Sequence, residues 1–347
     1  MKILGLDIGG ANTDCTIIEI NNSNEIISMK TDREYFPMWK DNDKLQQCLK
    51  KMTYNEDVHV VCVSMTAELA DGYTSKKEGV DDISKKIMEV FNEKEVYFVT
   101  FEGLKTYTEL KENLLSAAAA NWIGTTEIIK YIEEDCIFMD IGSTTTDIIP
   151  IKNKKEIALG HSDLERLQTG ELVYTGMLRT NLASIVHEVP INNINTKVSS
   201  ELFTITADIH RILGNIKEED YTCKTPDGNK KDVTSCKRRL ARLVCADLDS
   251  LDNNEIVNLA KYIEKEQINQ IYDGLKKVVN RTNINTVLIT SIGHGNLCEI
   301  AASKLNLNVI SLENYMSKKA SNVLTAIGAI QMYLDRMDKK IVLIKKV

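Results

Sequence analysis

The sequence predicts an α/β protein of two duplicated domains, each with a mixed sheet flanked by helices, and a cleft between them. Two near-identical loops lead to this prediction: Leu6–Asp14 reads LDIGGANTD, and Met139–Asp147 reads MDIGSTTTD. Each loop follows an apolar run, opens with Asp-Ile-Gly and ends in Thr-Asp before another apolar run. The same strand, turn and strand therefore occur twice within 347 residues, a length that suits two domains.

The first half has the pattern of an antiparallel meander followed by strand–helix–strand units. Apolar runs predict five strands here, at residues 2–7, 14–20, 25–30, 58–64 and 96–100. Helical spacing predicts two helices, at 41–52 and 82–91. Parallel and antiparallel strands would therefore share one mixed sheet.

The pattern restarts near residue 116. Four consecutive alanines, Ala117–Ala120, open a helix of small residues and would let another helix approach closely, as expected at a crossing between the halves. Apolar runs then predict further strands at 136–140, 146–151, 155–160 and 286–290, and helical patterns at 196–280 and 320–336, before a strand-like tail at 340–347. We expect a first domain at 1–117 plus 318–347, and a second at 118–317 with a helical insertion at about 196–280.

Composition excludes several classes of function. The net charge is −7 with acids and bases mixed, and no long basic block is present, so nucleic acid is not an expected partner. No apolar stretch approaches the ~18 residues of a membrane span. Asp7 interrupts the apolar N-terminus, so this segment is expected to be a strand rather than a signal peptide, in a cytoplasmic protein. Eight cysteines without a C-x-x-C pair fit reduced thiols, and the oligomeric state stays open.

The twin loops have the composition of phosphate-binding turns. A tight turn of glycines and hydroxyl residues points backbone N–H groups into one concave spot that suits phosphate oxygens. Asp7 and Asp140 would lie at strand ends and point into the cleft. Two carboxylates beside phosphates favour a divalent cation, expected to be Mg²⁺ held by Asp7 and Asp140, and one of them could act as a general base.

A third glycine-containing loop follows the predicted strand at 286–290. Gly293 and Gly295 permit close backbone approach, and the helix that follows favours negative charge at its N-terminus. This loop would form a wall for a nucleotide or substrate. His294 lies on it; an exposed neutral side chain is its default interpretation, and proton transfer is the alternative.

These motifs resemble a known superfamily. An early Asp-x-Gly-x-x-x-Thr, the middle Asp140–Asp147 segment and the late Gly-x-Gly are similar to those of the actin, Hsp70 and sugar-kinase superfamily. The form Gly9-Gly10-x-x-Thr13-Asp14 most resembles its hydantoinase and oxoprolinase branch. The resemblance implies duplicated actin-like, ribonuclease H-like domains around a central cleft.

Further segments resemble one archaeal subgroup, the tetrahydromethanopterin-linked C1-pathway proteins. They span most of the chain: Met65–Gly72, Lys77–Val80, Ala118–Trp122, Arg166–Gly176, Thr206–His210 and Arg239–Asp247. The resemblance implies a transferase of methanofuran biosynthesis with two small-molecule substrates. It would form an ether between the phenol of γ-glutamyltyramine and the furfuryl carbon of 5-(aminomethyl)-3-furanmethanol diphosphate, and would release diphosphate.

This reaction assigns roles to the loop residues. The diphosphate would occupy the place that ATP phosphates take in relatives, and its expected ligands are Gly9, Gly10, Asn12, Thr13, Asp14, Gly142, Ser143, Thr144, Thr145 and Asp147. A carboxylate must take the phenolic proton, since the pKa of a phenol is near ~10. Asp14, Asp147 and Glu171 are the candidates, although Asp14 and Asp147 more often support such loops from behind.

Other residues have a structural interpretation beside a functional one. Arg166, Glu171 and Tyr174 are possible residues of the substrate pocket. Arg239 and Arg242 have the spacing of a solvated helix face, yet either could reach a carboxylate or diphosphate. The alternative function is an ATP-dependent hydantoinase or small-molecule kinase, with ATP in the same loops; in the preferred interpretation ATP is not required. A third alternative, less favoured by the sequence, is a binding protein of the activator type that a nucleotide controls.

Overall fold

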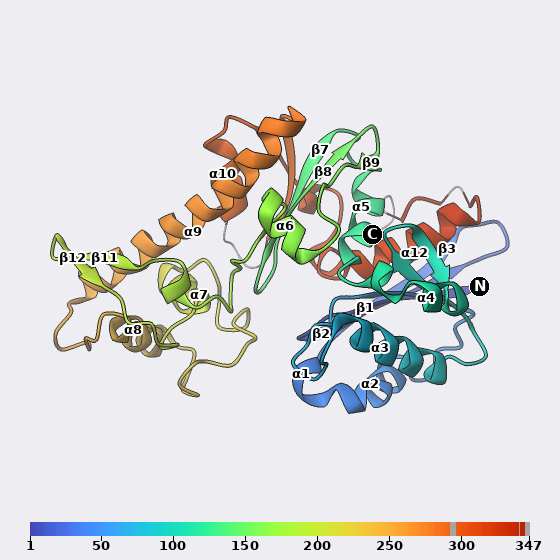
Figure 1. Cartoon of the computed structure of the whole chain (residues 1–347), viewed down its shortest axis with the longest axis horizontal. Helices are drawn as coiled ribbons and strands as arrows, with labels where there is room; N and C mark the ends of the chain where they lie inside the picture. The colour runs from blue at the N-terminus through green and yellow to red at the C-terminus, as the bar shows by residue number, and fades with distance from the viewer. Residues whose placement is uncertain (292–295, 340, 344–347) are drawn as a thin grey trace. The chain divides into compact units, whose positions relative to one another are not determined.

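The computed structural model describes residues 1–291, 296–339 and 341–343 (Figure 1). The chain forms two compact units. The first comprises residues 1–135, 151–163 and 312–347, and the second comprises residues 136–150 and 164–311. Each unit is built on a mixed sheet with helices packed against it, so the predicted fold class, a duplicated α/β domain of the actin-like type, is confirmed.

The first unit contains a six-stranded sheet in the order β3-β2-β1-β4-β5-β6. Its strands are β1 (Lys2–Ile8), β2 (Asn12–Ile20), β3 (Ile26–Tyr35), β4 (Val60–Met65), β5 (Glu95–Thr100) and β6 (Gly103–Thr106). Strands β1 to β3 are antiparallel, whereas β1, β4 and β5 run parallel. The five strands predicted in this half are confirmed. The sequence did not predict β6, because its four residues contain no apolar run.

Helices pack against this sheet. They are α1 (Met38–Asp41), α2 (Leu45–Met52), α3 (Lys76–Val90), α4 (Tyr107–Glu112), α5 (Asn121–Ile129), α11 (Lys318–Ser321) and α12 (Leu324–Arg336), with short 3₁₀ turns at 42–44, 114–117 and 312–314. Helix α3 begins before the predicted residue 82, because the Ser75 side chain accepts the Glu78 N–H and caps it there. In the predicted tail strand, the described residues 341–343 form no strand.

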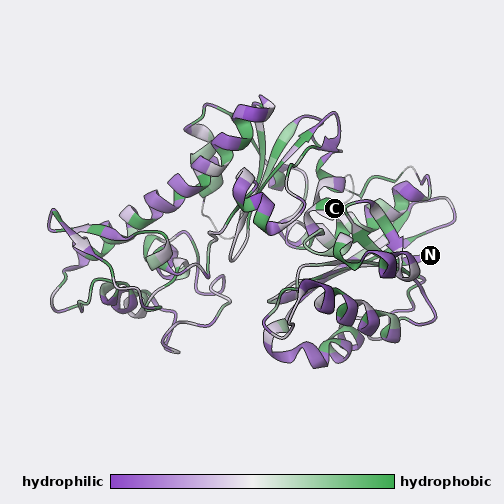
Figure 2. Ribbon diagram, viewed as in Figure 1, coloured by the Kyte–Doolittle hydropathy of each residue, from purple (hydrophilic) through white to green (hydrophobic). Residues whose placement is uncertain are grey.

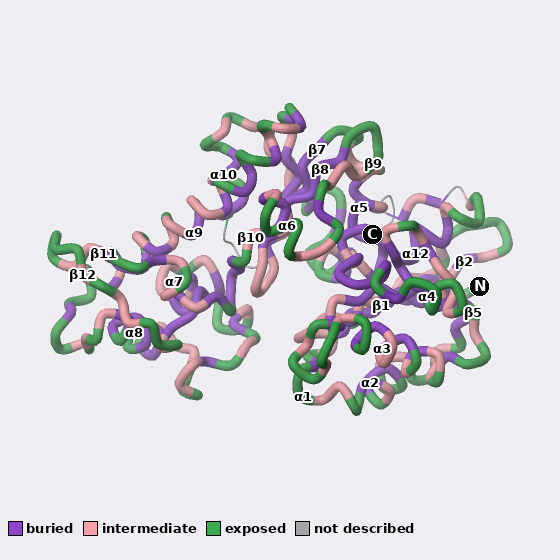
Figure 3. Tube along the Cα trace, in the orientation of Figure 1, coloured by how far each residue is buried: buried purple, intermediate pink, exposed green. Residues whose placement is uncertain are grey.

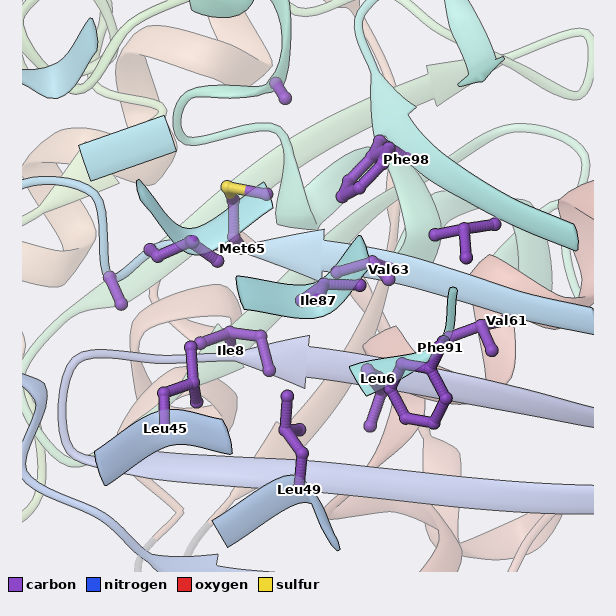
Figure 4. Packing of buried hydrophobic residues seen from close by; sticks show 14 of the residues in the cluster. Leu6, Ile8, Leu45, Leu49, Val61, Val63, Met65, Ile87, Phe91 and Phe98 are labelled. Atoms are coloured by element: carbon purple, nitrogen blue, oxygen red, sulfur yellow. The ribbon is translucent and has the colours of Figure 1, made fainter. Parts of the chain in front are cut away.

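The core of the first unit lies between the sheet and helices α2 and α3. Leu6 and Ile8 of β1 face the buried Leu45 and Leu49 of α2 (Figure 4). Hydrophobic residues follow the strands, while the outer faces of these helices are hydrophilic (Figure 2) and exposed (Figure 3). This alternation places Leu6 and Ile8 in the core and turns Asp7, between them, to the opposite face of the sheet.

Helices α5 and α12 cross closely within the first unit. A Cβ atom on Gly328 would overlap the backbone of Gly124, and one on Gly124 would lie 3.1 Å from the Thr325 carbonyl oxygen. The hydroxyls of Thr125 and Thr325 hydrogen bond at this crossing, at 3.0 Å. A close crossing is thus present, but two glycines form it, not the four predicted alanines, which precede α5.

A second sheet has the order β10-β8-β7-β13-β14, and β9 pairs with β8. The strands are β7 (Cys136–Ile141), β8 (Thr146–Lys152), β9 (Lys155–Glu156), β10 (Leu172–Val173), β13 (Thr286–Ser291) and β14 (Asn308–Ser311). Strands β7, β13 and β14 are parallel. The predicted strand at 155–160 is wrong in length, because β9 has only two residues.

The rest of the second unit is helical apart from one hairpin, β11 (Glu188–Ile191) with β12 (Ile194–Lys197). Its helices are α6 (Asp163–Thr169), α7 (Thr206–Leu213), α8 (Val233–Arg242), α9 (Asn253–Thr282) and α10 (Leu297–Ser303), with a 3₁₀ turn at 182–184. Side chains from α7, α8, α9 and β11 share a second hydrophobic core. The predicted helical insertion at 196–280 therefore contains three helices, with a non-helical segment at 214–232.

Two further expectations concern the whole chain. Residues 118–135, expected in the second domain, pack within the first unit because α5 contacts α12; the exact domain bounds stay a prediction. Across the described residues, the eight cysteines form no disulfide. Within the same residues, none of the helices combines the length and the apolar character that a membrane span requires.

The crossing of α5 and α12 gives a test of this packing. Replacing Gly328→Ala forces the helices apart, because the added methyl group would overlap the Gly124 backbone. Overpacking of this kind costs about 1–3 kcal/mol, and we expect a value near the upper end in urea unfolding followed by circular dichroism. Gln47→Ala on the exposed side of α2 is the control and should leave the midpoint unchanged. An equally stable Gly328→Ala protein would contradict the crossing.

Candidate active site

The first loop is a tight turn between β1 and β2. The Gly9 N–H donates to the Asn12 carbonyl oxygen at 2.9 Å, which closes the turn. The Phe36 N–H donates to the Ala11 carbonyl at 3.0 Å, and the Met38 N–H donates to the Gly10 carbonyl at 2.9 Å. A Cβ atom on Gly10 would meet no atom within 4 Å, so open space adjoins the turn.

The second loop repeats this turn in the other unit. The Gly142 N–H donates to the Thr145 carbonyl oxygen, again at 2.9 Å. The hydroxyls of Ser143 and Thr144 lie 3.3 Å apart at its tip. The internal repeat seen in the sequence is therefore a repeat of backbone geometry as well.

The segment 176–179 supports the second loop from behind. The N–H groups of Leu178 and Arg179 both donate to the Ser143 carbonyl, at 3.0 and 2.8 Å. Gly176 permits this contact, since a Cβ atom there would lie 2.5 Å from the Thr144 nitrogen. The Thr146 hydroxyl donates to the Thr175 carbonyl at 2.8 Å. The segment 175–179 thus holds the second loop in place.

Asp7 lies at the end of β1, in register with Asp14 on one side and Ser64 on the other. Burial, together with the charge of Asp14, raises the pKa of Asp7 to about 7. Its buried Oδ1 has no hydrogen-bond partner, and neither has the buried Ser64 hydroxyl. Buried polar atoms without partners are rare in native structures, and a binding site for a ligand would explain these two.

Asp140 has the matching position at the end of β7. It is in register with Thr290 of the parallel strand β13, and the Thr290 hydroxyl donates to its Oδ1 at 2.6 Å. Each aspartate therefore stands beside a hydroxyl residue on the neighbouring parallel strand. Neither hydroxyl residue was among the predicted site residues; the signal for both is a Ser or Thr near the end of the next predicted parallel strand.

The aspartates that end the two loops are paired with arginines. Arg33 of β3 donates to both oxygens of Asp14, from Nε at 2.6 Å and from Nη2 at 2.7 Å. Arg166 of α6, itself buried, donates to Asp147 at 2.7 Å and to the Glu171 carbonyl at 3.1 Å. Both pairs suit the supporting interpretation of Asp14 and Asp147, and they place Arg166 behind the second loop.

Glu171 and Tyr174 lie in different surroundings. The Glu171 side chain is fully buried and accepts from the Arg281 guanidinium and from the Thr169 hydroxyl. A carboxylate held in this way suits the support of the 170–176 segment better than proton exchange with a substrate. Tyr174 is 64% exposed on the short strand β10. Their roles in a substrate pocket stay predictions.

The remaining predicted residues divide into two groups. Gly293, His294 and Gly295 lie outside the described residues. The solvated-face interpretation is wrong for Arg239, which is wholly buried and bonds Asp208 at 2.7 Å and Asp227 at 3.1 Å. Periodicity missed this because the non-helical segment at 214–232, which carries Asp227, covers that part of α8.

The described residues offer few side-chain ligands for a metal ion. Within residues 1–291, 296–339 and 341–343, no group of three or more His, Cys, Asp or Glu side chains could hold a metal ion. Asp7, with its unpartnered carboxylate oxygen, fits one Mg²⁺ ligand, and phosphate oxygens and water would supply others. Magnesium at Asp7 and Asp140 stays a prediction.

One acidic residue of this region was absent from the predicted site. Glu68 follows β4 in the segment Met65–Gly72, which supported the subgroup resemblance only as a motif. It is 1% exposed, and its Oε2 has no hydrogen-bond partner. A glutamate in a loop gives no sign of burial in the sequence, so only the structure identifies it.

The chain has structural likeness to solved enzymes of low sequence identity. A ROK family glucokinase from Streptomyces griseus in complex with glucose and AMPPNP is 11% identical, with a TM-score of 0.47 over 95% of this chain and 98% of that one. Component A of the (R)-2-hydroxyglutaryl-CoA dehydratase of Acidaminococcus fermentans is 11% identical, with a TM-score of 0.46 over 98% and 100%.

One sequence relative matches nearly all of the chain, and a second matches about half of it. It is 41% identical over 341 residues to the (4-{4-[2-(gamma-L-glutamylamino)ethyl]phenoxymethyl}furan-2-yl)methanamine synthase of Methanocaldococcus jannaschii, across 98% of this chain and 99% of that protein. The synthase of the same name from Methanococcus vannielii is 38% identical over 194 residues, across 55% and 86%. Residues 59–331 match the family described as hydantoinase/oxoprolinase. The chain belongs to the hydantoinase/oxoprolinase family.

Proposed function

We propose that this chain is a transferase of methanofuran biosynthesis that forms the ether named in its curated relatives. The phenol of γ-glutamyltyramine replaces diphosphate on the furfuryl carbon of 5-(aminomethyl)-3-furanmethanol diphosphate. The observation that carries the proposal is the 41% identity with the Methanocaldococcus jannaschii synthase over 98% of the chain. This near-complete coverage favours the transferase over the ATP-dependent alternative.

The loops suit the first requirement of this reaction, which is the binding of a highly charged anionic leaving group. Turns closed by Gly9 and Gly142 leave backbone N–H groups and hydroxyls for phosphate oxygens. Open space beside Gly10 and the paired hydroxyls of Ser143 and Thr144 support this role. Because the donors are fixed by the fold, little reorganisation opposes departure of the diphosphate.

The strand-end aspartates meet the second requirement. Mg²⁺ bound by Asp7 and Asp140 would neutralise charge on the departing diphosphate. Thr290 fixes the orientation of the Asp140 carboxylate through its 2.6 Å hydrogen bond. The Oδ1 atom of Asp7, which has no hydrogen-bond partner, lies at the end of β1 and could bind the metal ion. Arg33 and Arg166 neutralise Asp14 and Asp147, so these two acids repel an incoming phosphate less.

Loss of the Asp140 carboxylate tests the placement of the site. We expect Asp140→Ala to lower the rate of ether formation by at least about 100-fold, since groups that stabilise developing charge are worth this much. The measurement is product formation by liquid chromatography and mass spectrometry. Asp249→Ala, at an exposed position remote in sequence, is the control and should keep full activity. An Asp140→Ala protein with full activity would show that the active site does not include the end of β7.

The nucleotide requirement separates the two classes of function. Purified protein with both substrates and Mg²⁺ should form ether and diphosphate in equal amounts without ATP, since the furan substrate itself supplies the leaving group. Addition of ATP should yield no ADP beyond the blank. An absolute need for ATP, or its sustained hydrolysis during turnover, would instead favour the hydantoinase-like or kinase alternative.

Asp7→Asn should lower activity while it raises stability. Folding raises the pKa of Asp7 from 3.8 to about 7, so between these values the folded protein binds more protons than the unfolded chain. This carboxyl therefore makes the free energy of unfolding fall as pH rises from about 4 to about 7. In metal-free protein, urea midpoints should show Asp7→Asn more stable above pH 7 and equal to wild type below about pH 4. A less stable variant at pH 8 would indicate a structural role.

A further inference from the structure

Glu68 is a buried acid outside the twin loops. It lies three residues after the end of β4, at 1% exposure. Its Oε2 is buried without a hydrogen-bond partner. A buried polar atom that lacks a partner costs free energy, and evolution retains few of them. A ligand that carries a hydrogen-bond donor would therefore satisfy this atom.

The backbone places Glu68 beside the first loop. The N–H groups of Thr66 and Ala67 both donate to the Ile8 carbonyl, at 2.9 and 3.1 Å. Ile8 stands between Asp7 and Gly9, so the segment that carries Glu68 is fixed to the turn itself. Four buried polar atoms without partners belong to this region: Asp7 Oδ1, Thr13 Oγ1, Ser64 Oγ and Glu68 Oε2. All lie on or just beyond the strands next to the turn, at the sheet edge where α/β proteins bind ligands.

Two features of neighbouring elements hold Glu68 in place. Gly79 of α3 packs directly on its backbone, and a Cβ atom there would overlap the Glu68 carbonyl group. On another side is Ala119, whose φ of 54° lies in the left-handed region, which costs energy for a residue other than glycine. Such strain persists where the surroundings enforce it, and it is frequent at functional sites.

Two charged residues and two backbone N–H groups act on Glu68. Burial raises its pKa to about 7; the N–H groups of Glu68 and Ala119 and the Lys76 ammonium favour the charged form, while Asp163 opposes it. Lys76 and Asp163 pair at 3.9 Å, which reduces both effects. The charge of Glu68 in turn makes a small contribution to the raised pKa of Asp7. The acid can therefore gain and lose a proton near neutral pH.

We propose that Glu68 is the general base that takes the phenolic proton of γ-glutamyltyramine, an inference that rests on the proposed function. In this step the O–H bond of the phenol breaks and its proton moves to Glu68 Oε2. The phenolic oxygen forms the new bond to the furfuryl carbon. The bond from that carbon to diphosphate breaks, and diphosphate leaves with the electron pair.

Asp7 also has a buried oxygen without a partner, but the proposed function assigns it to Mg²⁺. Three further carboxylates of the described site are less suited to this role. Asp14 is held by Arg33, Asp147 by Arg166, and Glu171 by Arg281. Glu68 alone among these four has an oxygen among the buried atoms without a partner. Its seclusion from bulk water also suits a reaction whose cationic carbon must not meet water.

The test uses Glu68→Gln in the full chain, a substitution that keeps shape and removes the base. Turnover of γ-glutamyltyramine should fall by about 10²–10⁴-fold, with KM little changed. A difluorinated γ-glutamyltyramine with a more acidic phenol should recover much of this loss, because it needs less help to lose its proton. Glu93→Gln, at an exposed position, is the matched control and should behave as wild type.

The pH profile gives a second readout. For wild-type protein, kcat should rise with pH through one ionisation, because the base must be unprotonated, and Glu68→Gln should lack that rise. Glu68→Asp retains a carboxylate, so its kcat should still rise with pH although the rate is reduced. This variant provides the test if Glu68→Gln does not fold. Gly79→Ala should lower kcat by displacing the Glu68 backbone.

Separate outcomes address the inference and the proposed function. Wild-type protein that makes no ether from the two substrates would refute the proposed function. Wild-type protein that makes the ether, with Glu68→Gln equally active, would refute the base alone. Glu68→Gln could also lose the same fraction of activity with γ-glutamyltyramine and with its difluorinated analogue, while the pH profile stays unchanged. That result would show a structural role for Glu68 and would also overturn the inference.

Discussion

A single backbone hydrogen bond, made twice, sets the geometry on which the rest of this protein depends. It joins the Gly9 N–H to the Asn12 carbonyl in one unit and the Gly142 N–H to the Thr145 carbonyl in the other. The tight turn fixes the register of the two strands it connects. Because side chains alternate along a strand, a slip of one residue would turn Asp7 into the hydrophobic core. The turn therefore decides where the acid of each loop points.

Charge compensation around these turns is selective. Arg33 and Arg166 each neutralise the aspartate that ends a loop, as buried or half-buried charges require. Asp7 and Glu68 instead retain buried oxygens without partners, and burial raises the pKa of each to about 7. The supporting aspartates thus have partners, whereas Asp7 and Glu68 each keep an unpaired oxygen at a cost in stability. Positions that cost stability in this way are commonly functional.

The helical part of the second unit also bears on its loop. Gln267 of α9 donates from Nε2 to the Thr175 hydroxyl at 3.0 Å and to the Gly176 carbonyl at 2.9 Å. Its Oε1 lies 3.0 Å from Nε2 of His210, whose pKa burial lowers to about 4, so this imidazole is neutral. The 176–179 segment that supports Ser143 is thus fixed to α7 and α9. The insertion predicted at 196–280 is part of the support of the second loop.

The sequence by itself determined the fold class and the position of the twin loops, because strand periodicity and tight-turn chemistry are local properties. It also indicated Asp7 and Asp140 as strand-end acids. Only the tertiary structure decided which acids have partners, since Arg33, Arg166 and Arg281 lie 19, 19 and 110 residues from the carboxylates that they bind. The same holds for the buried Glu68 and for the glycines at the α5–α12 crossing. Burial and pairing depend on residues distant in the chain, and no local pattern specifies them.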